Sequence, residues 1–292
     1  MTPTATSHTY FSHRLRLHYL DWGNEDAPPM LLVHGSQDHC HSWDEIAREF
    51  ARDYHVLAID LRGHGDSEWA MGSTYTSMEY IYDIAQLVHQ RDLRDVTVVA
   101  HSMGGSLALK YAGIYPERVG RMVIIEGVGN WWSAQWHRFG DTVHDALRDW
   151  ISNLRQTSSR QPRRYDSLDA AYERMHQQNS HLTADKARYL TQHGSSQNED
   201  GSWSWKFDNY TRTWTPFDMP AEVTTKLWER ITCPVLFINA KQGYDHRTGQ
   251  DDSLAHFQHG EVVDVDQAGH WLHHDQPEIF LRETRAFLGV AP

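Results

Sequence analysis

The chain has 292 residues, enough for one large α/β domain with an insertion, and this length does not require two independent domains. Its hydrophobic content of 39% and charged content of 23% are globular values, and no apolar run is long enough to span a membrane. The net charge of −12 argues against a nucleic acid or an anionic membrane as partner. The N-terminus lacks the apolar core of a signal peptide, so we expect a cytoplasmic protein.

The first third of the chain alternates short strands with helices. Residues 15–20 alternate apolar and polar side chains, which predicts an antiparallel edge strand. Further strands are expected at 30–33 and 54–59, and helices at 43–50 and 78–90. The second strand runs into His34-Gly35-Ser36-Gln37, and the third runs into D-L-R-G-H-G-D-S from Asp60 to Ser67.

Residues 96–105 read V-T-V-V-A-H-S-M-G-G, and a helical segment follows at 106–115. The β-branched valines predict a buried strand. A strand that turns sharply into a helix with a serine at the turn is a nucleophile elbow, whose pattern is G-x-S-x-G. Here Ala100 replaces the first glycine and keeps the small size, and Gly104 is the second. The pattern predicts that Ser102 points its hydroxyl into a cleft.

After the elbow, a strand is expected at 119–125, directly followed by Glu126. The segment 130–220 then interrupts the alternation, with helices predicted at 135–154, 168–178 and 184–193 and a linker at 156–164. The alternation resumes with strands at 235–238 and 262–265, a short helix at 253–258 and a closing helix at 279–288. Before that closing helix the chain reads A-G-H-W-L-H-H-D-Q-P-E from Ala268 to Glu278.

These motifs, in this order, resemble the α/β-hydrolase superfamily over nearly the whole chain. The resemblance implies an α/β fold with a mostly parallel central sheet flanked by helices. It also implies a helical cap inserted after the strand that ends near Glu126. We therefore expect a hydrolase core formed by residues 1–129 and 221–292, and a cap formed by residues 130–220.

The resemblance also implies a set of catalytic groups. Ser102 would be the nucleophile and His270 the base, and the backbone amides of Ser36 and Met103 would form the oxyanion hole. No metal and no cofactor are implied. Asp38-His39-Cys40-His41 carries metal-ligand residue types, but their spacing matches no known site.

The acid of the triad has two candidates. The family commonly places an aspartate after the strand predicted at 235–238, but Gly243 stands at the aligned position and Asp245 follows slightly later. Some relatives, including many haloalkane dehalogenases, keep the acid after the strand that here ends before Glu126. A carboxylate directly after a buried strand needs a partner that offsets its desolvation. We favour Glu126, with Asp245 as the alternative.

The expected activity is that of a serine hydrolase that cleaves a carboxylic ester through an acyl-enzyme. Haloalkane dehalogenases and epoxide hydrolases of this fold use an aspartate nucleophile, whereas a serine forms an acyl-enzyme. The alternatives are hydrolysis of a lactone or a carbon–carbon bond with the same triad, and a non-catalytic receptor for a small ligand.

The expected partner is a small, apolar ester, with no nucleic acid and no membrane; assembly as a homodimer stays open. Candidate substrate contacts are Gln37, His101, Trp131 and Trp271. His273 and His274 do not follow the motif glycine, so we expect them to be loop-surface or packing residues.

Overall fold

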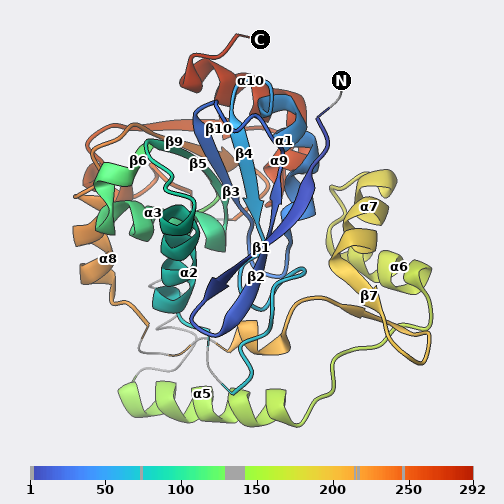
Figure 1. The fold of residues 1–292 in the computed structure, drawn as a ribbon. Helices are drawn as coiled ribbons and strands as arrows, with labels where there is room; N and C mark the ends of the chain where they lie inside the picture. Colours follow the sequence, from blue (N-terminus) through green and yellow to red (C-terminus); the bar gives the residue numbers. More distant parts are fainter. Residues whose placement is uncertain are drawn as a thin grey trace.

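The computed structural model describes residues 3–72, 75–128, 142–213, 215, 218–244 and 247–291. Its main sheet has eight strands in the order β1-β2-β4-β3-β5-β6-β9-β10 (Figure 1). β1 and β2 pair antiparallel with each other and β2 with β4, and the other neighbours are parallel. The strands are β1 (Thr6–Ser12), β2 (Leu15–Asp21), β3 (Pro29–Val33), β4 (His55–Ile59), β5 (Val96–His101), β6 (Val119–Ile125), β9 (Val235–Ala240) and β10 (Gly260–Val265).

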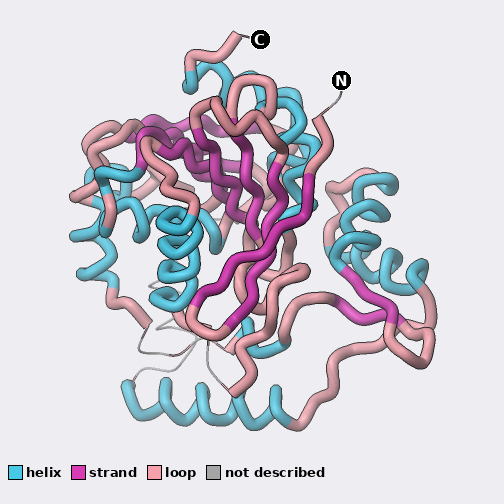
Figure 2. Tube along the Cα trace, in the orientation of Figure 1, coloured by secondary structure: helices cyan, strands magenta, loops and turns pink. Residues whose placement is uncertain are grey.

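Helices cover both faces of this sheet (Figure 2). One face packs against α2 (Ser77–Gln90), α3 (Met103–Ile114) and α8 (Ala221–Trp228). The other packs against α1 (Asp44–Phe50), α9 (Leu272–Asp275) and α10 (Pro277–Leu288). The central strands are buried on both faces, so Val98 faces one helical layer and Val99 the other. Complete burial of a large aliphatic side chain contributes about 1.5–3 kcal/mol.

The edge of the sheet differs from the prediction. We expected the edge strand at 15–20, but β2 lies between two neighbours and β1 forms the edge. β1 has the sequence T-S-H-T-Y-F-S, and its first four residues are exposed. A strand with so few buried side chains has no clear apolar alternation, which is the reason that the sequence did not indicate it.

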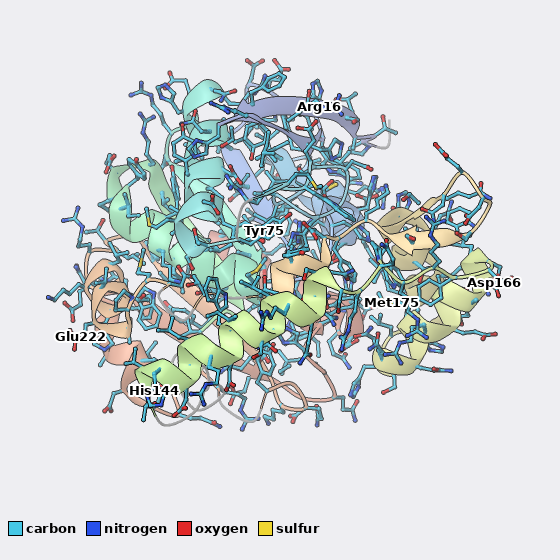
Figure 3. The ribbon with its side chains drawn as sticks, turned by 90° about the horizontal axis from the view of Figure 1, so that it is seen from below. Arg16, Tyr75, His144, Asp166, Met175 and Glu222 are labelled. Atoms are coloured by element: carbon cyan, nitrogen blue, oxygen red, sulfur yellow. The ribbon has the colours of Figure 1, made fainter. Side chains whose placement is uncertain are left out.

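The segment between β6 and β9 contains three helices that lie away from the main sheet. These are α5 (Val143–Ser158), α6 (Leu168–Gln178) and α7 (Ala184–Gly194). A small hairpin of β7 (Ser195–Gln197) and β8 (Trp203–Trp205) follows α7. In the view from below, α5 runs across the molecule from His144. Met175 of α6 lies beyond the end of α5 that is far from His144 (Figure 3). The division into core and cap stays a prediction.

The helix boundaries in this segment follow their capping residues. α6 has the predicted bounds, and Thr183 caps α7 by accepting from the Lys186 amide. α5 extends to Ser158, into the predicted linker, and the start predicted for it at 135 lies outside the described residues. α8 was not predicted. It packs closely on α3, since a Cβ on Gly113 would lie 2.3 Å from the Leu227 carbonyl oxygen.

Short 3-10 turns complete the structure: η1 (Cys40–Trp43), η2 (Pro116–Arg118), η3 (Asn209–Arg212) and η4 (Asp252–His256). Within the described part of the chain, no helix has the length and apolar character needed to cross a bilayer.

Candidate active site

The motif residues meet at one edge of the sheet, where the parallel strands end. Val33 of β3 lies opposite Ala100 of β5, His101 of β5 opposite Ile125 of β6, and Ile125 opposite Ile238 of β9. The loops after β3, β5, β6 and β9 therefore leave the sheet side by side. The carboxyl edge of a parallel sheet is the usual place for a ligand site in this class of fold.

Ser102 lies in a strained turn between β5 and α3. Its backbone has φ 52° and ψ −121°, a conformation that costs a non-glycine residue about 1–3 kcal/mol. The surroundings leave no room for larger neighbours, because a Cβ on Gly104 would lie 2.3 Å from the His34 carbonyl oxygen. The small-residue pattern of the sequence thus corresponds to close contact between the turn and the end of β3.

His270 lies in the loop between β10 and α9. Its Nε2 is 2.9 Å from Ser102 Oγ, so it accepts the serine hydroxyl proton when the ring carries its own proton on Nδ1. Two contacts hold the loop: the Gly269 amide donates to Asp275 Oδ2 at 2.8 Å, and His101 Nε2 donates to the His270 carbonyl oxygen at 2.8 Å. This arrangement is suited to general-base activation of the serine.

Glu126 approaches the other side of the His270 ring. Its side chain is 2% exposed, and Oε2 lies 3.6 Å from His270 Nδ1. The carboxylate also accepts from the Ala240 amide at 2.8 Å and from the Tyr244 amide at 3.1 Å. His270 Nδ1 is buried and has no hydrogen-bond partner in the described residues. The separation of 3.6 Å is longer than a hydrogen bond, and catalytic contacts are often long in the absence of substrate.

Gly243 explains how Glu126 fits there. A Cβ on Gly243 would lie 2.4 Å from Glu126 Oε2, so any side chain at position 243 would collide with the carboxylate. Position 243 is where the family pattern places its acid. The carboxylate of Glu126, which follows β6, therefore occupies space that stays open because the residue at position 243, after β9, is a glycine. Asp245, the alternative acid, lies outside the described residues.

The segment after β3 is held by a buried histidine. His34 Nδ1 donates to the Gly35 carbonyl oxygen at 2.6 Å, and Nε2 accepts from the Leu61 amide at 3.0 Å. Burial lowers the pKa of His34 to about 3, so the ring is neutral, which is the state that this donor–acceptor pair requires. Ser36 follows Gly35, and Met103 is the first residue of α3. Their role as oxyanion donors stays a prediction.

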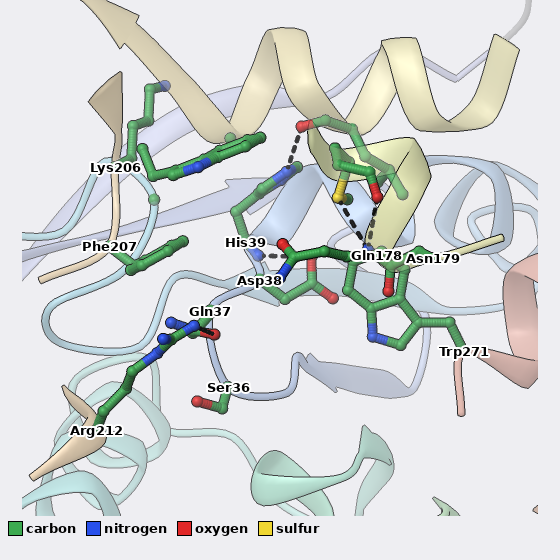
Figure 4. A pocket seen from close by; sticks show the side chains of 15 residues that line it. Ser36, Gln37, Asp38, His39, Gln178, Asn179, Lys206, Phe207, Arg212 and Trp271 are labelled. Carbon is green, nitrogen blue, oxygen red and sulfur yellow. Dashed lines mark hydrogen bonds between the residues drawn. The ribbon is translucent and has the colours of Figure 1, made fainter. Parts of the chain in front are cut away.

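A cavity of about 340 Å³ adjoins this centre (Figure 4). Its lining includes Ser36, Gln37 and Trp271, which flank the catalytic groups in sequence. Its other polar lining consists of Asp38, His39, Gln178, Asn179, Lys206 and Arg212, and its aromatic lining includes Trp205 and Phe207. We expected an apolar ester as the substrate, and the wall combines aromatic residues with polar ones and carries two cationic side chains.

The four predicted substrate contacts thus have different positions. Gln37 and Trp271 line the cavity. His101 does not belong to its lining; it is completely buried, with its ring 4.6 Å from that of His270. A Cβ on Gly35 would lie 2.9 Å from His101 Nδ1, so His101 packs between the His34 loop and His270. Trp131 lies outside the described residues.

His273 and His274 are packing residues rather than surface residues. The His273 ring lies between Trp43, at 4.6 Å, and His101, at 4.8 Å. His274 Nε2 shares a hydrogen bond of 3.0 Å with Ser42 Oγ. Burial holds the pKa of both rings well below the usual value, so both are neutral. The two histidines follow His270 closely in the sequence, and this spacing does not reveal that they are buried.

The metal-type residues after Gln37 do not gather into one site. Of that run only Cys40 lies in a group whose ligand atoms are within 4.8 Å of one another, and its companions are His18 and Asp60. This group is already hydrogen-bonded: His18 Nδ1 lies 2.7 Å from Asp60 Oδ2, and the Cys40 amide donates to Asp60 Oδ1 at 2.7 Å. The Asp60 carboxylate thereby joins β2, η1 and the D-x-R-G turn.

Comparison with known proteins agrees with this architecture. The family model described as alpha/beta hydrolase fold matches residues 28–277. The thioesterase domain from the curacin biosynthetic pathway is structurally similar, with a TM-score of 0.84 and 20% identity over 97% of this chain and 99% of that chain. The chain therefore belongs to the α/β-hydrolase family, as the sequence motifs predicted.

Two curated relatives match shorter segments. A probable serine hydrolase of Drosophila melanogaster is 36% identical over 110 residues, 37% of this chain and 33% of that protein. Epoxide hydrolase 4 of Mus musculus is 33% identical over 127 residues, 42% of this chain and 35% of that protein. The matched part thus spans about a third of each relative. These similarities define a hydrolase family and leave the reaction to be argued from the site.

Proposed function

We propose that this protein is a serine hydrolase that cleaves a carboxylic ester through an acyl-enzyme. The observation that carries the proposal is the contact of 2.9 Å between Ser102 Oγ and His270 Nε2 at the strained end of β5. A serine hydroxyl is a weak nucleophile, and a base within hydrogen-bond reach activates it.

The proposed reaction has two halves. Ser102 Oγ attacks the ester carbonyl carbon while His270 Nε2 takes its proton, and the amides of Ser36 and Met103 stabilise the oxyanion. His270 then protonates the leaving alcohol, and a water activated by His270 hydrolyses the acyl-enzyme. One oxyanion donor typically accounts for about 3 kcal/mol of transition-state stabilisation.

Serine at position 102 favours acyl transfer over epoxide opening. Attack of a serine oxygen on an epoxide carbon would form an ether, which has no carbonyl carbon that water could attack to release the enzyme. Attack by a carboxylate would form an ester, which water can hydrolyse. Multiple turnover with Ser102 as the nucleophile therefore requires a substrate that contains an acyl group.

We also propose that Glu126 is the acid of the triad. Its buried carboxylate lies 3.6 Å from His270 Nδ1 and accepts two backbone amides, which support its ionised form. The collision expected for a side chain at position 243 supports the same assignment. We further propose that residues 130–220 form a cap over the cavity, because its lining includes residues of α6 and α7.

Hydrolysis of p-nitrophenyl esters with acyl chains from C2 to C12 tests the reaction, with Ser102→Ala as the matched control. We expect turnover by the wild type that Ser102→Ala abolishes, and labelling of Ser102 by a fluorophosphonate probe. Equal turnover by both proteins would contradict the assigned nucleophile. Labelling without hydrolysis of any ester would favour a lactone or carbon–carbon substrate, and absence of labelling would favour a receptor.

A further inference from the structure

Of the two cationic side chains in the cavity wall, one has no acidic partner among the described residues. Lys206 is paired with Asp66 Oδ1 at 2.7 Å. Arg212, at the end of η3, forms no ion pair with an Asp or Glu of the described residues. Although the side chain is partly exposed, its partial burial and the neighbouring Arg174 guanidinium both lower the pKa of Arg212. An arginine beside a second arginine, at the wall of a substrate cavity, favours the arrival of an anion.

The side-chain amide of Gln37 adds a hydrogen-bond donor beside Arg212. Its Oε1 accepts from Arg212 Nη2 at 2.5 Å, which orients the amide group. Its Nε2 is buried and has no hydrogen-bond partner in the described residues. The Gln37 backbone is left-handed, with φ 61°, an uncommon and strained conformation for a non-glycine residue. Strain and an unsatisfied buried donor at one residue indicate a site that a ligand completes.

The position of this pair relative to the catalytic groups defines which part of a substrate it would reach. Gln37 directly follows Ser36, whose amide is the proposed oxyanion donor. His270 must reach the leaving oxygen, so the alcohol part belongs on the side of His270 and Trp271. Arg212 and Gln37 lie on the other side of the cavity from Trp271 (Figure 4). The acyl part of an ester would therefore extend toward Arg212.

We propose that Arg212 and Gln37 form a carboxylate-binding subsite, and that the substrate is an ester whose acyl chain ends in a free carboxylate. This inference rests on the proposed esterase function and names its substrate class. The planar guanidinium offers up to five N–H donors, of which one is used by Gln37 Oε1, and the Gln37 amide supplies another donor beside them. A carboxylate matches this set, because it accepts through two oxygens in one plane.

Two esters of the same shape test the subsite. Mono-p-nitrophenyl glutarate ends in a carboxylate, and p-nitrophenyl 5-methylhexanoate ends in a neutral isopropyl group of similar size. We expect a higher kcat/KM for the glutarate ester in the wild type. Arg212→Met should lower kcat/KM for the glutarate ester about ten- to a hundredfold more than for the neutral ester, as expected for the loss of a charge-assisted hydrogen bond. Most of this loss should be a rise in KM.

Gln37→Leu should reduce the same preference by a smaller factor, because it removes a neutral donor. Arg163→Met is the matched control: Arg163 is exposed and contacts Tyr165, away from the cavity lining. It should leave the preference unchanged. Equal kcat/KM of the wild type for the two esters, or an equal effect of Arg212→Met on both, would overturn the subsite and leave the esterase function intact.

Binding of glutarate tests the subsite without turnover. Calorimetry should detect glutarate binding to the wild type and to Arg163→Met, and a loss of binding to Arg212→Met. Should neither ester be hydrolysed and the fluorophosphonate fail to label Ser102, the esterase function is wrong, and glutarate binding still decides the subsite. Absence of Arg212-dependent binding would overturn it.

Discussion

The two sides of the site are built differently. On the side of the proposed triad, called the catalytic side below, Ser102 and Glu126 each follow a central strand directly, and both have left-handed backbones, with φ 52° and φ 50°. Both side chains are buried among residues of the sheet and its loops. On the cavity side, Arg212 belongs to the short turn η3, is exposed, and is held to the core by one hydrogen bond to Gln37.

This difference separates two tasks. The reacting groups need fixed positions, and a buried sheet holds strained turns that an isolated loop would relax. The cavity wall needs only to present the right chemistry, and a charged side chain on a turn can do so with few supporting contacts. The effects of substitutions on the two sides should therefore differ in size and in kind.

The largest expected effect is that of Glu126→Gln. The amide cannot stabilise a charged His270 ring, so kcat should fall by about 10³–10⁴-fold, the size of loss known for an acid-to-amide change in a serine triad. Steady-state hydrolysis of the preferred p-nitrophenyl ester measures it, with Asp245→Asn as the matched control that should retain most of its activity. The reverse pattern of rates would show that Asp245 is the acid.

Acidification should weaken the buried catalytic side. The pKa values of His34, His39 and His64 are lowered by burial to about 3, 4 and 4, so the native state binds no proton there at pH 5.5, whereas the unfolded chain binds nearly three. Asp38 opposes this, because burial raises its pKa to about 7 and the native state holds one extra proton.

These groups alone give a net difference of about two protons, and His101, His273 and His274, whose pKa values burial also lowers, add to it in the same direction. The free energy of unfolding should therefore fall by at least about 2.7 kcal/mol per pH unit between roughly pH 6 and pH 5. This stability is fully present above pH 6.5, and it is lost as the pH falls toward the native pKa values of the histidines. Urea unfolding at pH 7.5, 6 and 5 measures it. His144→Ala, which removes an exposed ring, should leave the slope unchanged. A flat profile from pH 7 to 5 would contradict the prediction.

Gly243→Ala tests whether a side chain at position 243 and the Glu126 carboxylate would occupy the same space. The added Cβ would lie 2.4 Å from Glu126 Oε2 and displace the carboxylate, and a displacement of about 1 Å can cost about 10²-fold in rate. Kinetics of the preferred ester measure the loss. Glu126→Asp in the Gly243→Ala background should recover part of kcat, because the shorter side chain withdraws from the new methyl group. Full activity of Gly243→Ala would contradict the claim that the Glu126 carboxylate needs the space left open by Gly243.

The smallest expected effect is that of His101→Phe, which keeps an aromatic ring and removes the donor to the His270 carbonyl oxygen. Loss of one hydrogen bond of about 1 kcal/mol corresponds to about a fivefold fall in kcat, with KM little changed. His101→Gln can donate again and should restore the rate. Equal rates for His101→Phe and the wild type would remove His101 as a positioning residue.

The sequence predicted the catalytic side much better than the cavity side. Around Ser102, close packing permits only small residues, and this steric demand leaves a readable pattern of Ala100, Gly104 and Gly105. The strands carry apolar runs, and α6 and α7 begin after the N-capping residues Ser167 and Thr183. Gly243 could be recognised as the position where the family's acid is absent, because it stands at a fixed distance after a strand.

Arg212 left no such pattern. It is one arginine in a polar stretch, and its proposed role rests on the absence of an acidic partner among the described residues, a feature of the three-dimensional structure that a linear sequence does not record. The same applies to His101, whose burial follows from packing between two loops that are far apart in the chain. β1 was missed for a related reason, since its pairing with β2 is stabilised by backbone hydrogen bonds and involves few apolar side chains.

The two strained residues keep their amide groups in the sheet. The Ser102 amide donates to the Ile125 carbonyl oxygen at 2.8 Å, and the Glu126 amide donates to the Ile238 carbonyl oxygen at 3.2 Å. These amide hydrogens can exchange with deuterium only when the carboxyl ends of β5, β6 and β9 separate, so we expect their exchange to be slow. The positions of the proposed nucleophile and acid should therefore persist through local fluctuations of the surrounding loops.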